Sequence, residues 1–475
     1  MAATVVLAAA GRRVIVLDMQ PAPGGQIYRG LEANLAAAPQ TNTLLVALGP
    51  AYLAGKDLIH QFRTTPGITY RPDHTVWELR SDGTVGWLHS DQAGYLRAPQ
   101  ILLANGAMER PVPFDGWTLP GVMTAGAVQT MLKAGQMKPS GRVVLAGTGP
   151  LLVLLADQLR KLGVDIAMVA RTDRLRDQIS AIPKLRLAAM PGVLKGLGWL
   201  ARLRFAGVAS LRGVTGLQAL GSDRVQSVRI RSAKRVVELP CDLLIVHDGI
   251  VPATDVAQGA GLQLGWDQST LCWNPKTQED GQAMPTPGAA LTDGPCRIRI
   301  SGDARRIGGA EAAIAHGRHA AAAILQDLSG AASTLSAVRR SLAPRPFLDA
   351  AFPPGLAAKL PDDAAIVCRC EEITAGALRE ALRNGARDIN DIRGITRCGM
   401  GPCQGRSCMI TLARMIATTT NEPPQPFRER PPIRPISLGE LASLSGTDPR
   451  LSQIISLDDK PLVAGPKAST GAADV

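Results

Sequence analysis

Five of the chain's eight cysteines lie together in one short window near the C-terminus. Cys368 and Cys370 form a C-x-C pair, and Cys398, Cys403 and Cys408 follow in RCGMGPCQGRSC. Soft thiolate ligands at such spacing select zinc or iron–sulfur centres. Disulfides are the competing interpretation, but the remaining cysteines are scattered singly and the first residues lack the layout of a secretory signal. The window therefore predicts a protein that moves electrons.

The residues around these cysteines favour an iron–sulfur cluster over zinc. Zinc sites usually pair their cysteines as C-x2-C to C-x4-C, whereas this window opens with C-x-C. Four thiolates around an oxidised [2Fe-2S] core leave an anion, which nearby guanidinium and backbone N–H groups would stabilise. Glycines would let the backbone approach the sulfur atoms closely. The neighbouring arginines are Arg369, Arg393, Arg397 and Arg406, and the glycines are Gly399, Gly401 and Gly405.

The stretch between the early and the late cysteines predicts a small helical module. In ITAGALREALRNGARDINDIRGI, Thr374 suits the N-cap of a helix, with Leu378 and Leu382 on one face. A second short amphipathic segment follows it. The cysteines would then lie at the two ends of this helical stretch.

VCRCEE followed by TRCGMGPCQGRSC resembles the small [2Fe-2S] domain of bacterioferritin-associated ferredoxin. More closely, it is similar to the version fused to FAD-containing subunits of three kinds of complex: opine oxidases, the related hydrogen cyanide synthase and dye-linked proline dehydrogenases. The resemblance leaves Cys398 as the spare cysteine. Two alternatives stay open: Cys398 could replace Cys403 or Cys408 as a ligand, or the cysteines could form a zinc site or be free thiols. The cluster ligands that it implies are Cys368, Cys370, Cys403 and Cys408.

Composition is that of a multi-domain α/β enzyme. The 475 residues are 45% hydrophobic but only 3% aromatic, and 49 glycines suit nucleotide-binding folds. No apolar run reaches the ~20 residues that span a bilayer. The net charge of +12 is dispersed and accompanies no nucleic-acid motif, so we expect no nucleic-acid partner. We expect a cytoplasmic protein, with any membrane association arising through its complex.

The N-terminal segment GRRVIVLDMQPAPGGQIYR carries the first dinucleotide signal. Residues 14–17 predict a buried strand that ends in Asp18, and an acid there hydrogen-bonds an adenosine ribose hydroxyl in Rossmann units. Gly24 and Gly25 give a flexible turn. The family resemblance implies that Gly24, Gly25 and Gln26 lie along a flavin.

The usual partner of that segment is missing from the sequence. AATVVLAAAGRR resembles the helix that follows a G-x-G-x-x-G loop, but neither the loop nor its strand precedes it. Such a loop and the helix N-terminus after it hold the pyrophosphate. A start codon placed too far downstream and a degraded gene are the two explanations, and we favour the first. We expect the 475-residue chain to retain flavin poorly.

A second dinucleotide signal lies in SGRVVLAGTGPLLVLLADQLRKLGVDIAMVAR. The segment predicts strand, turn, helix and strand, with Gly147 and Gly149 in the first two glycine positions and Leu152 in the third. Arg171 stands near the position of the acid in NAD-binding units and would pair with a 2′-phosphate or lie on the surface. An adenine nucleotide, NAD(P)H or a structural relic are the alternatives here.

Two further segments complete the flavin argument. ILLANGAMER predicts a strand, after which the family resemblance implies that Gly106 approaches the cofactor. RIRISGDARRIGG predicts a strand that ends in Gly302 and Asp303. The resemblance implies that this aspartate contacts the ribityl chain of FAD. Asp303 could equally cap the helix that follows.

The histidines are not expected to be catalytic. His247 follows the buried strand in CDLLIVH and is interpreted as a packing or domain-interface residue. His316 and His319 are expected to be solvated helix positions.

The predicted fold is α/β: two Rossmann-like FAD/NAD(P)-binding domains of the disulfide-reductase type and a small helical [2Fe-2S] domain. A Pro-rich stretch after Asn421 is expected to form an extended arm, and the final Gly/Ala/Ser residues to be disordered. The predicted boundaries are 1–130 with 265–330 for the FAD domain, 131–264 for the inserted second domain, 331–359 for a linker, 360–418 for the cluster domain, and 419–475 for the arm and tail.

The sequence thus predicts an electron-transferring FAD and [2Fe-2S] subunit of an opine-oxidase-like or amino-acid dehydrogenase complex. The resemblance implies a second, glycine-oxidase-like flavoprotein subunit that oxidises the secondary amine, and an electron acceptor such as a quinone. No substrate-side catalytic residue is assigned. A stand-alone NAD(P)H-dependent oxidoreductase and a non-enzymatic iron–sulfur scaffold or redox sensor remain as alternatives.

Overall fold

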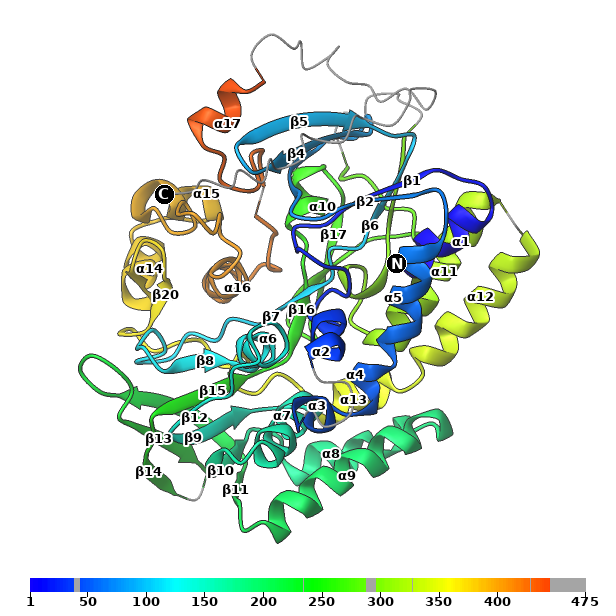
Figure 1. Cartoon of the computed structure of the whole chain (residues 1–475). Helices are drawn as coiled ribbons and strands as arrows, with labels where there is room; N and C mark the ends of the chain where they lie inside the picture. The colour runs from blue at the N-terminus through cyan, green and yellow to red at the C-terminus, as the bar shows by residue number, and fades with distance from the viewer. Residues whose placement is uncertain (38–42, 234, 288–295, 327, 428, 445–475) are drawn as a thin grey trace, which may run out of the picture.

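The structure is a computed structural model that describes residues 1–37, 43–233, 235–287, 296–326, 328–427 and 429–444. These residues form two units with sheets at their centres and a smaller helical module that lies beside both (Figure 1). The tail residues 445–475, for which disorder was predicted, lie outside the described residues.

A parallel sheet in the order β11–β10–β9–β15–β8 forms the centre of the second unit. Alternate side chains of its strands point to opposite faces, so Val143 and Leu145 meet helices, while Val144 and Ala146 meet a three-stranded antiparallel sheet. Both faces are thereby covered, as a parallel sheet requires. The strands are β8 (Val122–Thr124), β9 (Arg142–Gly147), β10 (Asp165–Arg171), β11 (Ala209–Arg212) and β15 (Leu243–His247); the antiparallel sheet is β12 (Val214–Leu220), β13 (Ser227–Ser232) and β14 (Val236–Pro240).

The helices of this unit follow the predicted strand–turn–helix–strand pattern. Pro150 opens α7 directly after the glycine turn, where its missing N–H costs nothing. The helices are α6 (Ala125–Gly135), α7 (Pro150–Lys161), α8 (Leu175–Ala181) and α9 (Met190–Phe205), with 3₁₀ turns η1 (Ile182–Lys184) and η2 (Leu187–Ala189) between the last two.

The first unit draws on stretches far apart in the sequence. Strand β19 (Arg297–Ile300) pairs in parallel with β6 (Gln100–Leu103), and β1 (Val14–Leu17) pairs in parallel with β2 (Ile68–Arg71). Among the described residues these two pairs are separate sheets. Antiparallel strands β3 (Thr75–Leu79), β4 (Thr84–His89) and β5 (Gln92–Arg97) form a third.

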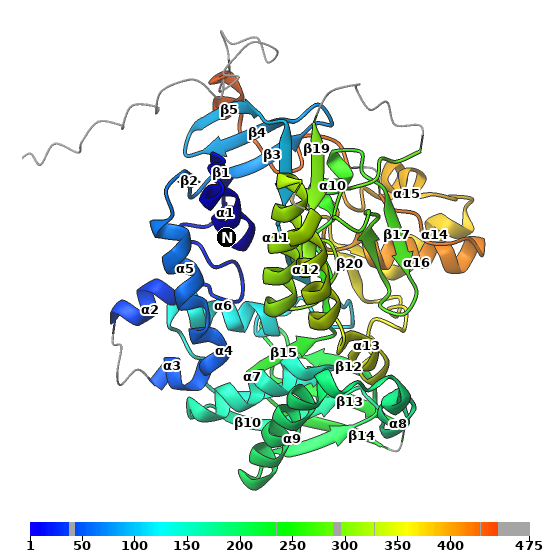
Figure 2. The same cartoon turned by 90° about the vertical axis from the view of Figure 1, so that its right-hand side faces the viewer.

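Alanine-rich helices pack closely over this first unit. Helices α1 (Ala2–Ala9) and α11 (Ala310–Leu325) meet through Ala3, Leu7 and Ala321, and α12 lies alongside α11 (Figure 2). A Cβ on Gly317 would lie 3.2 Å from the backbone nitrogen of Ala3, so the small residue permits this approach. The remaining elements are α2 (Leu31–Ala37), α3 (Thr43–Leu48), α4 (Pro50–Leu53), α5 (Gly55–Thr64), β7 (Ala107–Glu109), β16 (Ile250–Pro252), α10 (Asp255–Gly259), β17 (Leu264–Asp267), β18 (Cys272–Pro275), η3 (Gly302–Ala304), α12 (Leu328–Ser341) and α13 (Arg345–Ala351).

The cysteine-rich module is helical, as predicted. Thr374 caps α14 by accepting a hydrogen bond from the Ala377 N–H, and Leu378 and Leu382 are buried on one face. The following chain runs back as an extended arm, because Phe427 is buried in the module and Ile433 donates to the Trp77 carbonyl at 2.9 Å. The elements are β20 (Ile366–Cys368), β21 (Ile373–Thr374), α14 (Ala375–Arg383), α15 (Ile389–Thr396), α16 (Met409–Thr420) and α17 (Leu438–Ala442).

Within the described parts of the chain, no helix combines the length and the apolar character needed to cross a bilayer.

Candidate functional site

Three buried cysteines converge at the centre of the module. Strand β20 supplies Cys368, the turn after α15 supplies Cys398, and Cys408 stands at the N-cap of α16. Their Sγ atoms all lie within 4.8 Å of one another. Interaction with the Cys398 and then the Cys408 thiol lowers the pKa of Cys368 to about 2, whereas the pKa of Cys398 is raised to about 12, chiefly by Cys368.

The other two cysteines form the outer side of this group. Cys370 is exposed and Cys403 is half-buried. A hydrogen bond with the Cys403 backbone lowers the pKa of the Cys370 thiol, but burial, the Cys403 thiol and Cys368 together raise it above its usual value. The structure therefore places Cys368 and Cys408 in the buried group together with Cys398, and pairs the other two predicted ligands, Cys370 and Cys403, on its outer side.

Glycines let the backbone fold tightly around these sulfur atoms. The Gly399 N–H donates to Cys368 Sγ at 3.4 Å. A Cβ on Gly401 would lie only 2.3 Å from the Cβ of Cys370, and Gly405 adopts a φ of +82° that favours glycine. Buried soft donors with a backbone N–H aimed at sulfur fit an iron–sulfur cluster.

Two of the four predicted arginines turn toward this group. Arg406 donates through Nε to the Cys403 carbonyl at 3.0 Å. Burial lowers the pKa of Arg393, while Cys408 and Cys398 raise it, and its guanidinium lies 3.9 Å over the Phe427 ring. By contrast, Arg369 is exposed, and Arg397 pairs with Glu371 at 2.9 Å. The cationic environment is therefore built by Arg393 and Arg406.

The predicted flavin residues lie at the carboxyl ends of parallel strands, where dinucleotides bind in this type of fold. Asp18 follows β1, and its carboxylate accepts hydrogen bonds from the Gln20 N–H at 3.0 Å and from the Tyr70 hydroxyl at 3.3 Å. Burial raises the pKa of Asp18. Gly106 follows β6 with a φ of +72° and open space where a Cβ would stand. Gly302 follows the paired strand β19.

The turn at Gly24 and Gly25 adopts positive φ angles that favour glycine, as the predicted flexible turn requires. Their φ angles are +132° and +57°, and a Cβ on Gly24 would lie 2.6 Å from the Tyr28 carbonyl oxygen. The carbonyl of Gln26 accepts a hydrogen bond from Lys133 Nζ at 3.2 Å. Burial lowers the pKa of Lys133 to about 8. The open positions at Gly25 and Gly106 leave the backbone accessible, which fits a flavin dinucleotide.

Asp303 has the capping role that the sequence left open. Its Oδ1 accepts from the N–H groups of Gly308 and Gly309, at 2.8 and 3.0 Å, just before α11 begins. The carboxylate thus fixes the turn at the N-terminus of that helix. The capping role is compatible with the predicted contact between Asp303 and the ribityl chain of FAD, which stays a prediction.

The second dinucleotide turn is tightly built. A Cβ on Gly147 would lie 1.7 Å from the His247 carbonyl oxygen, and that oxygen accepts from the Thr148 N–H at 2.8 Å. Gly149 caps α7 with a φ of +92°, and Leu152 is fully buried, which agrees with a packing role for the third position. Among the described residues, the Thr148 hydroxyl is buried without a hydrogen-bond partner.

Arg171 does not lie on the surface, so that interpretation was wrong. It is buried and forms a two-pronged ion pair with Asp173, whose carboxylate lies 2.7 Å from its Nη2. Its guanidinium is therefore held by a carboxylate within the protein, and pairing with a 2′-phosphate stays a prediction.

The histidines also differ from expectation. His316 and His319 are buried rather than solvated, and burial lowers the pKa of His316 to about 4. His247 is buried as predicted for a packing residue, and its Nδ1 pairs with Glu109, which also accepts from the Gly126 N–H at 2.9 Å. No sequence motif marked Glu109, because the pair joins residues far apart in the chain.

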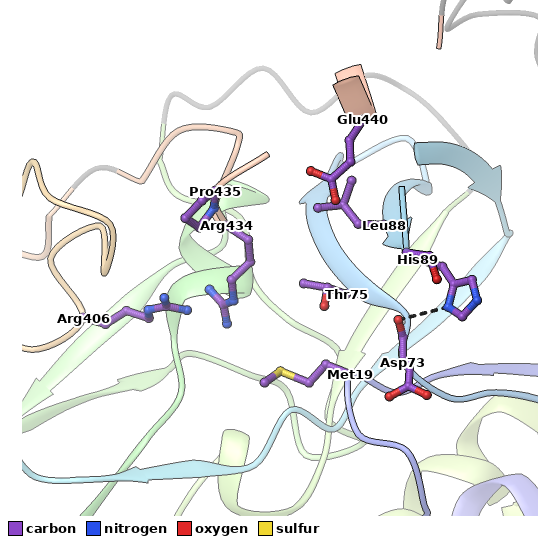
Figure 3. A pocket seen from close by; sticks show the side chains of 10 residues that line it. Met19, Asp73, Thr75, Leu88, His89, Arg406, Arg434, Pro435 and Glu440 are labelled. Atoms are coloured by element: carbon purple, nitrogen blue, oxygen red, sulfur yellow. Dashed lines mark hydrogen bonds between the residues drawn. The ribbon is translucent and has the colours of Figure 1, made fainter. Parts of the chain in front are cut away.

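A cavity of about 410 Å³ lies where the module, the arm and the first unit meet (Figure 3). The side chains of Arg406 and Arg434 point into it from one side, opposite Thr75 and His89. Asp255 holds both arginines, with carboxylate distances of 3.7 Å to Arg406 and 2.5 Å to Arg434. The arginine next to the cysteines is thereby tied to the first unit.

Comparison with known proteins agrees with this arrangement. Residues 1–272 match the pyridine nucleotide-disulphide oxidoreductase family, and residues 366–418 match the BFD-like [2Fe-2S] binding domain. The opine oxidase A chain of Agrobacterium tumefaciens (strain Ach5) is 37% identical over 96% of this chain and 92% of its own length. Hydrogen cyanide synthase subunit HcnB of Pseudomonas aeruginosa is 30% identical over 94% of this chain and 97% of its own.

The crystal structure of L-proline dehydrogenase from P. horikoshii has a similar fold, with a TM-score of 0.64 at 17% identity, over 93% of this chain and 76% of that chain. The predicted α/β fold class is confirmed: a disulfide-reductase-like FAD/NAD(P)-binding oxidoreductase with a small cysteine-rich [2Fe-2S] domain. Within that class, the chain belongs to the family that includes the opine oxidase A subunits and the HcnB subunits of hydrogen cyanide synthase.

Proposed function

We propose that this chain is the electron-transferring subunit of a complex that oxidises a secondary amine or an amino acid. A glycine-oxidase-like flavoprotein subunit would break the C–H bond next to nitrogen and pass on two electrons. This chain would relay them toward an acceptor such as a quinone. The observation that carries the proposal is the convergence of three buried cysteines, with Cys370 and Cys403 paired beside them, in a chain whose relatives are named as oxidase and synthase subunits.

FAD would supply two-electron chemistry and a [2Fe-2S] cluster one-electron chemistry. We assign the cluster to Cys368, Cys370, Cys403 and Cys408. Their placement supports the assignment, since the Cys368 side is buried while the Cys370 side reaches the surface, where a partner could approach. The Gly399 N–H and the Arg406 side chain would stabilise negative charge on this group.

We assign the flavin to the first unit. The carboxylate of Asp18 would bind the adenosine ribose, and the exposed backbone at the glycine turn and after β6 would face the rest of the dinucleotide. An adenine nucleotide is proposed for the second unit, where the buried Thr148 hydroxyl stands between two glycines. The assigned residues are Asp18, Gly24, Gly25, Gln26, Gly106, Gly302 and Asp303 for FAD, with Gly147 and Gly149 for the second nucleotide.

Amine-driven acceptor reduction by the complex tests this function. The chain would be co-expressed with a candidate glycine-oxidase-like flavoprotein. The rate of quinone-analogue reduction would be measured with Cys368→Ser and with Cys296→Ser as the matched control. We expect Cys368→Ser to stop acceptor reduction while the partner's own flavin is still bleached by substrate. Cys296 lies outside the cysteine group, so its variant should keep the rate.

Two outcomes would contradict the proposal. Acceptor reduction unaffected by Cys368→Ser would remove the cluster from the electron path. Rapid oxidation of NADH or NADPH by the purified chain alone would favour a self-sufficient reductase instead.

A further inference from the structure

Helix α9 is apolar on two opposite sides. One side faces the core, where Leu203 is buried and Trp199 and Leu200 pack against the cluster of residues around α7. A helix of this kind at a protein surface normally carries polar side chains on its other side. Here the other side is not polar.

The outward side of α9 carries a stripe of exposed apolar residues. Leu194, Leu197, Ala201 and Phe205 are spaced three, four and four residues apart, so they share one helix face. Phe205 is 89% exposed, and Leu187 in the turn just before the helix is 90% exposed. Leaving such side chains in water is unfavourable, which indicates that something covers them.

Basic residues border this stripe. Lys195 and Arg204 are exposed positions on either side of it. Lys184 and Arg186 are exposed in the preceding segment. The sequence from residue 178 to residue 222 contains no aspartate or glutamate at all.

We propose that α9 and the turn before it form a peripheral binding site for an anionic lipid surface. Apolar side chains on one face with lysine and arginine beside them are the pattern of helices that lie in the membrane interface. Long basic side chains can reach phosphate headgroups while the leucines and the phenylalanine enter the acyl boundary. The inference does not depend on the proposed electron-transfer function.

The geometry favours a lipid surface over a protein partner. The stripe lies on a single helix at the lower edge of the molecule, opposite α17 (Figure 1). A protein covering it would have to desolvate the flanking cations, and lysine is depleted in the cores of protein interfaces. Anionic headgroups would instead satisfy these cations directly.

Vesicle flotation of the full chain tests the site. Vesicles of phosphatidylcholine alone would be compared with vesicles that contain phosphatidylglycerol. The test variant replaces Leu194, Leu197 and Phe205 with glutamate. The matched control replaces three exposed apolar residues elsewhere, Met137, Val236 and Leu438, with glutamate.

We expect binding to the anionic vesicles that falls at least tenfold in the test variant and is unchanged in the control. Both should keep the unmodified melting temperature, because all six side chains are exposed. Lys195→Glu with Arg204→Glu should weaken binding most at low salt. Absence of flotation of the unmodified chain, or equal flotation of the test variant, would overturn the proposal. If the unmodified chain forms an oligomer that dissociates in the test variant, and neither protein binds vesicles, the stripe is a protein interface and the proposal is overturned.

Discussion

The indole nitrogen of Trp117 donates a hydrogen bond to the backbone carbonyl of Ile366, at 2.6 Å. Ile366 begins the strand that ends in Cys368, so the bond ties the first cysteine strand to the segment before β8. Arg406, which lies between Cys403 and Cys408 in the sequence, forms an ion pair with Asp255 at 3.7 Å and so makes a second contact between the module and the first unit. The position of the cluster module relative to the dinucleotide units is therefore held from two sides.

Replacement of Trp117 by phenylalanine should loosen this contact. We expect a loss of about 1–2 kcal/mol of stability, because the Ile366 carbonyl loses its donor while most of the apolar contact is kept. Cluster absorbance should then decay faster on warming than in the unmodified protein. Trp266→Phe is the matched control, since that indole donates to the Gln268 side chain, two residues away in the sequence. Equal decay rates in the two variants would argue against the tie.

Gly147→Ala should be strongly destabilising. The new Cβ would lie 1.7 Å from the His247 carbonyl oxygen at a φ of +135°, so strand β15 would have to move. We expect a loss of at least about 3 kcal/mol, measured by thermal unfolding. Gly163→Ala separates the strain of a positive φ from the steric clash, because Gly163 has a φ of +72° but open space where a Cβ would stand. That control should cost only about 1–2 kcal/mol. Similar losses in both variants would contradict the predicted clash.

Glu429 should make stability depend on pH. Burial first, and then Asp255, raise its pKa from 4.5 to about 7, although Arg393, Arg406 and Arg434 oppose the rise. A raised folded-state pKa means that the contribution to stability is complete below about pH 4.5 and is lost as pH rises through about 7. At 1.36 kcal/mol per pKa unit, the loss amounts to about 3 kcal/mol.

Glu429→Gln removes this titration. Relative to the unmodified protein, the variant should therefore gain stability as the pH rises from about 5 to about 8, and the difference should then level off. Melting temperatures at a series of pH values measure it. A difference that stays constant across the series would show that the carboxyl does not titrate in this range.

A serine series tests which cysteines are ligands. We expect Ser at position 368, 370, 403 or 408 to abolish the visible and EPR signals of the cluster, and Cys398→Ser to leave them. The close approach of Cys398 to Cys368 and Cys408 makes that last variant the informative one. If the signals are lost in Cys398→Ser but survive in Cys370→Ser or Cys403→Ser, Cys398 is a ligand and takes the place of the cysteine whose replacement is tolerated.

Local patterns predicted the local structure well. The N-cap at Thr374, the glycine turn at Gly147 and the strand before Asp18 depend on residues close in sequence, and all three form at the expected positions. The prediction that this strand is buried was wrong, since Ile15 is 43% exposed. The role of the residues around a functional site was harder to predict. Arg171 stands near a cofactor position of the motif, but the motif does not predict that it is buried in an ion pair with Asp173.

Contacts between distant segments had no sequence signal. The burial of His316 follows from α11 being enclosed on several sides, among them by α1 and α12, although the helix alone looks amphipathic and solvated. Asp248 likewise accepts hydrogen bonds from the N–H groups of Gly355, Leu356 and Ala357, at 3.0, 3.1 and 2.7 Å, which fastens the chain ahead of the cysteine module. Such contacts are set by the packing of whole elements, which periodicity does not encode.

Metal analysis combined with EPR spectroscopy of the anaerobically purified full chain tests the central claim most directly. The account predicts two irons and two acid-labile sulfides per chain, no stoichiometric zinc, and a [2Fe-2S] EPR signal that appears when the protein is reduced by one electron. Stoichiometric zinc, or a protein that stays EPR-silent on reduction, would contradict the electron-transfer role of the cysteine module.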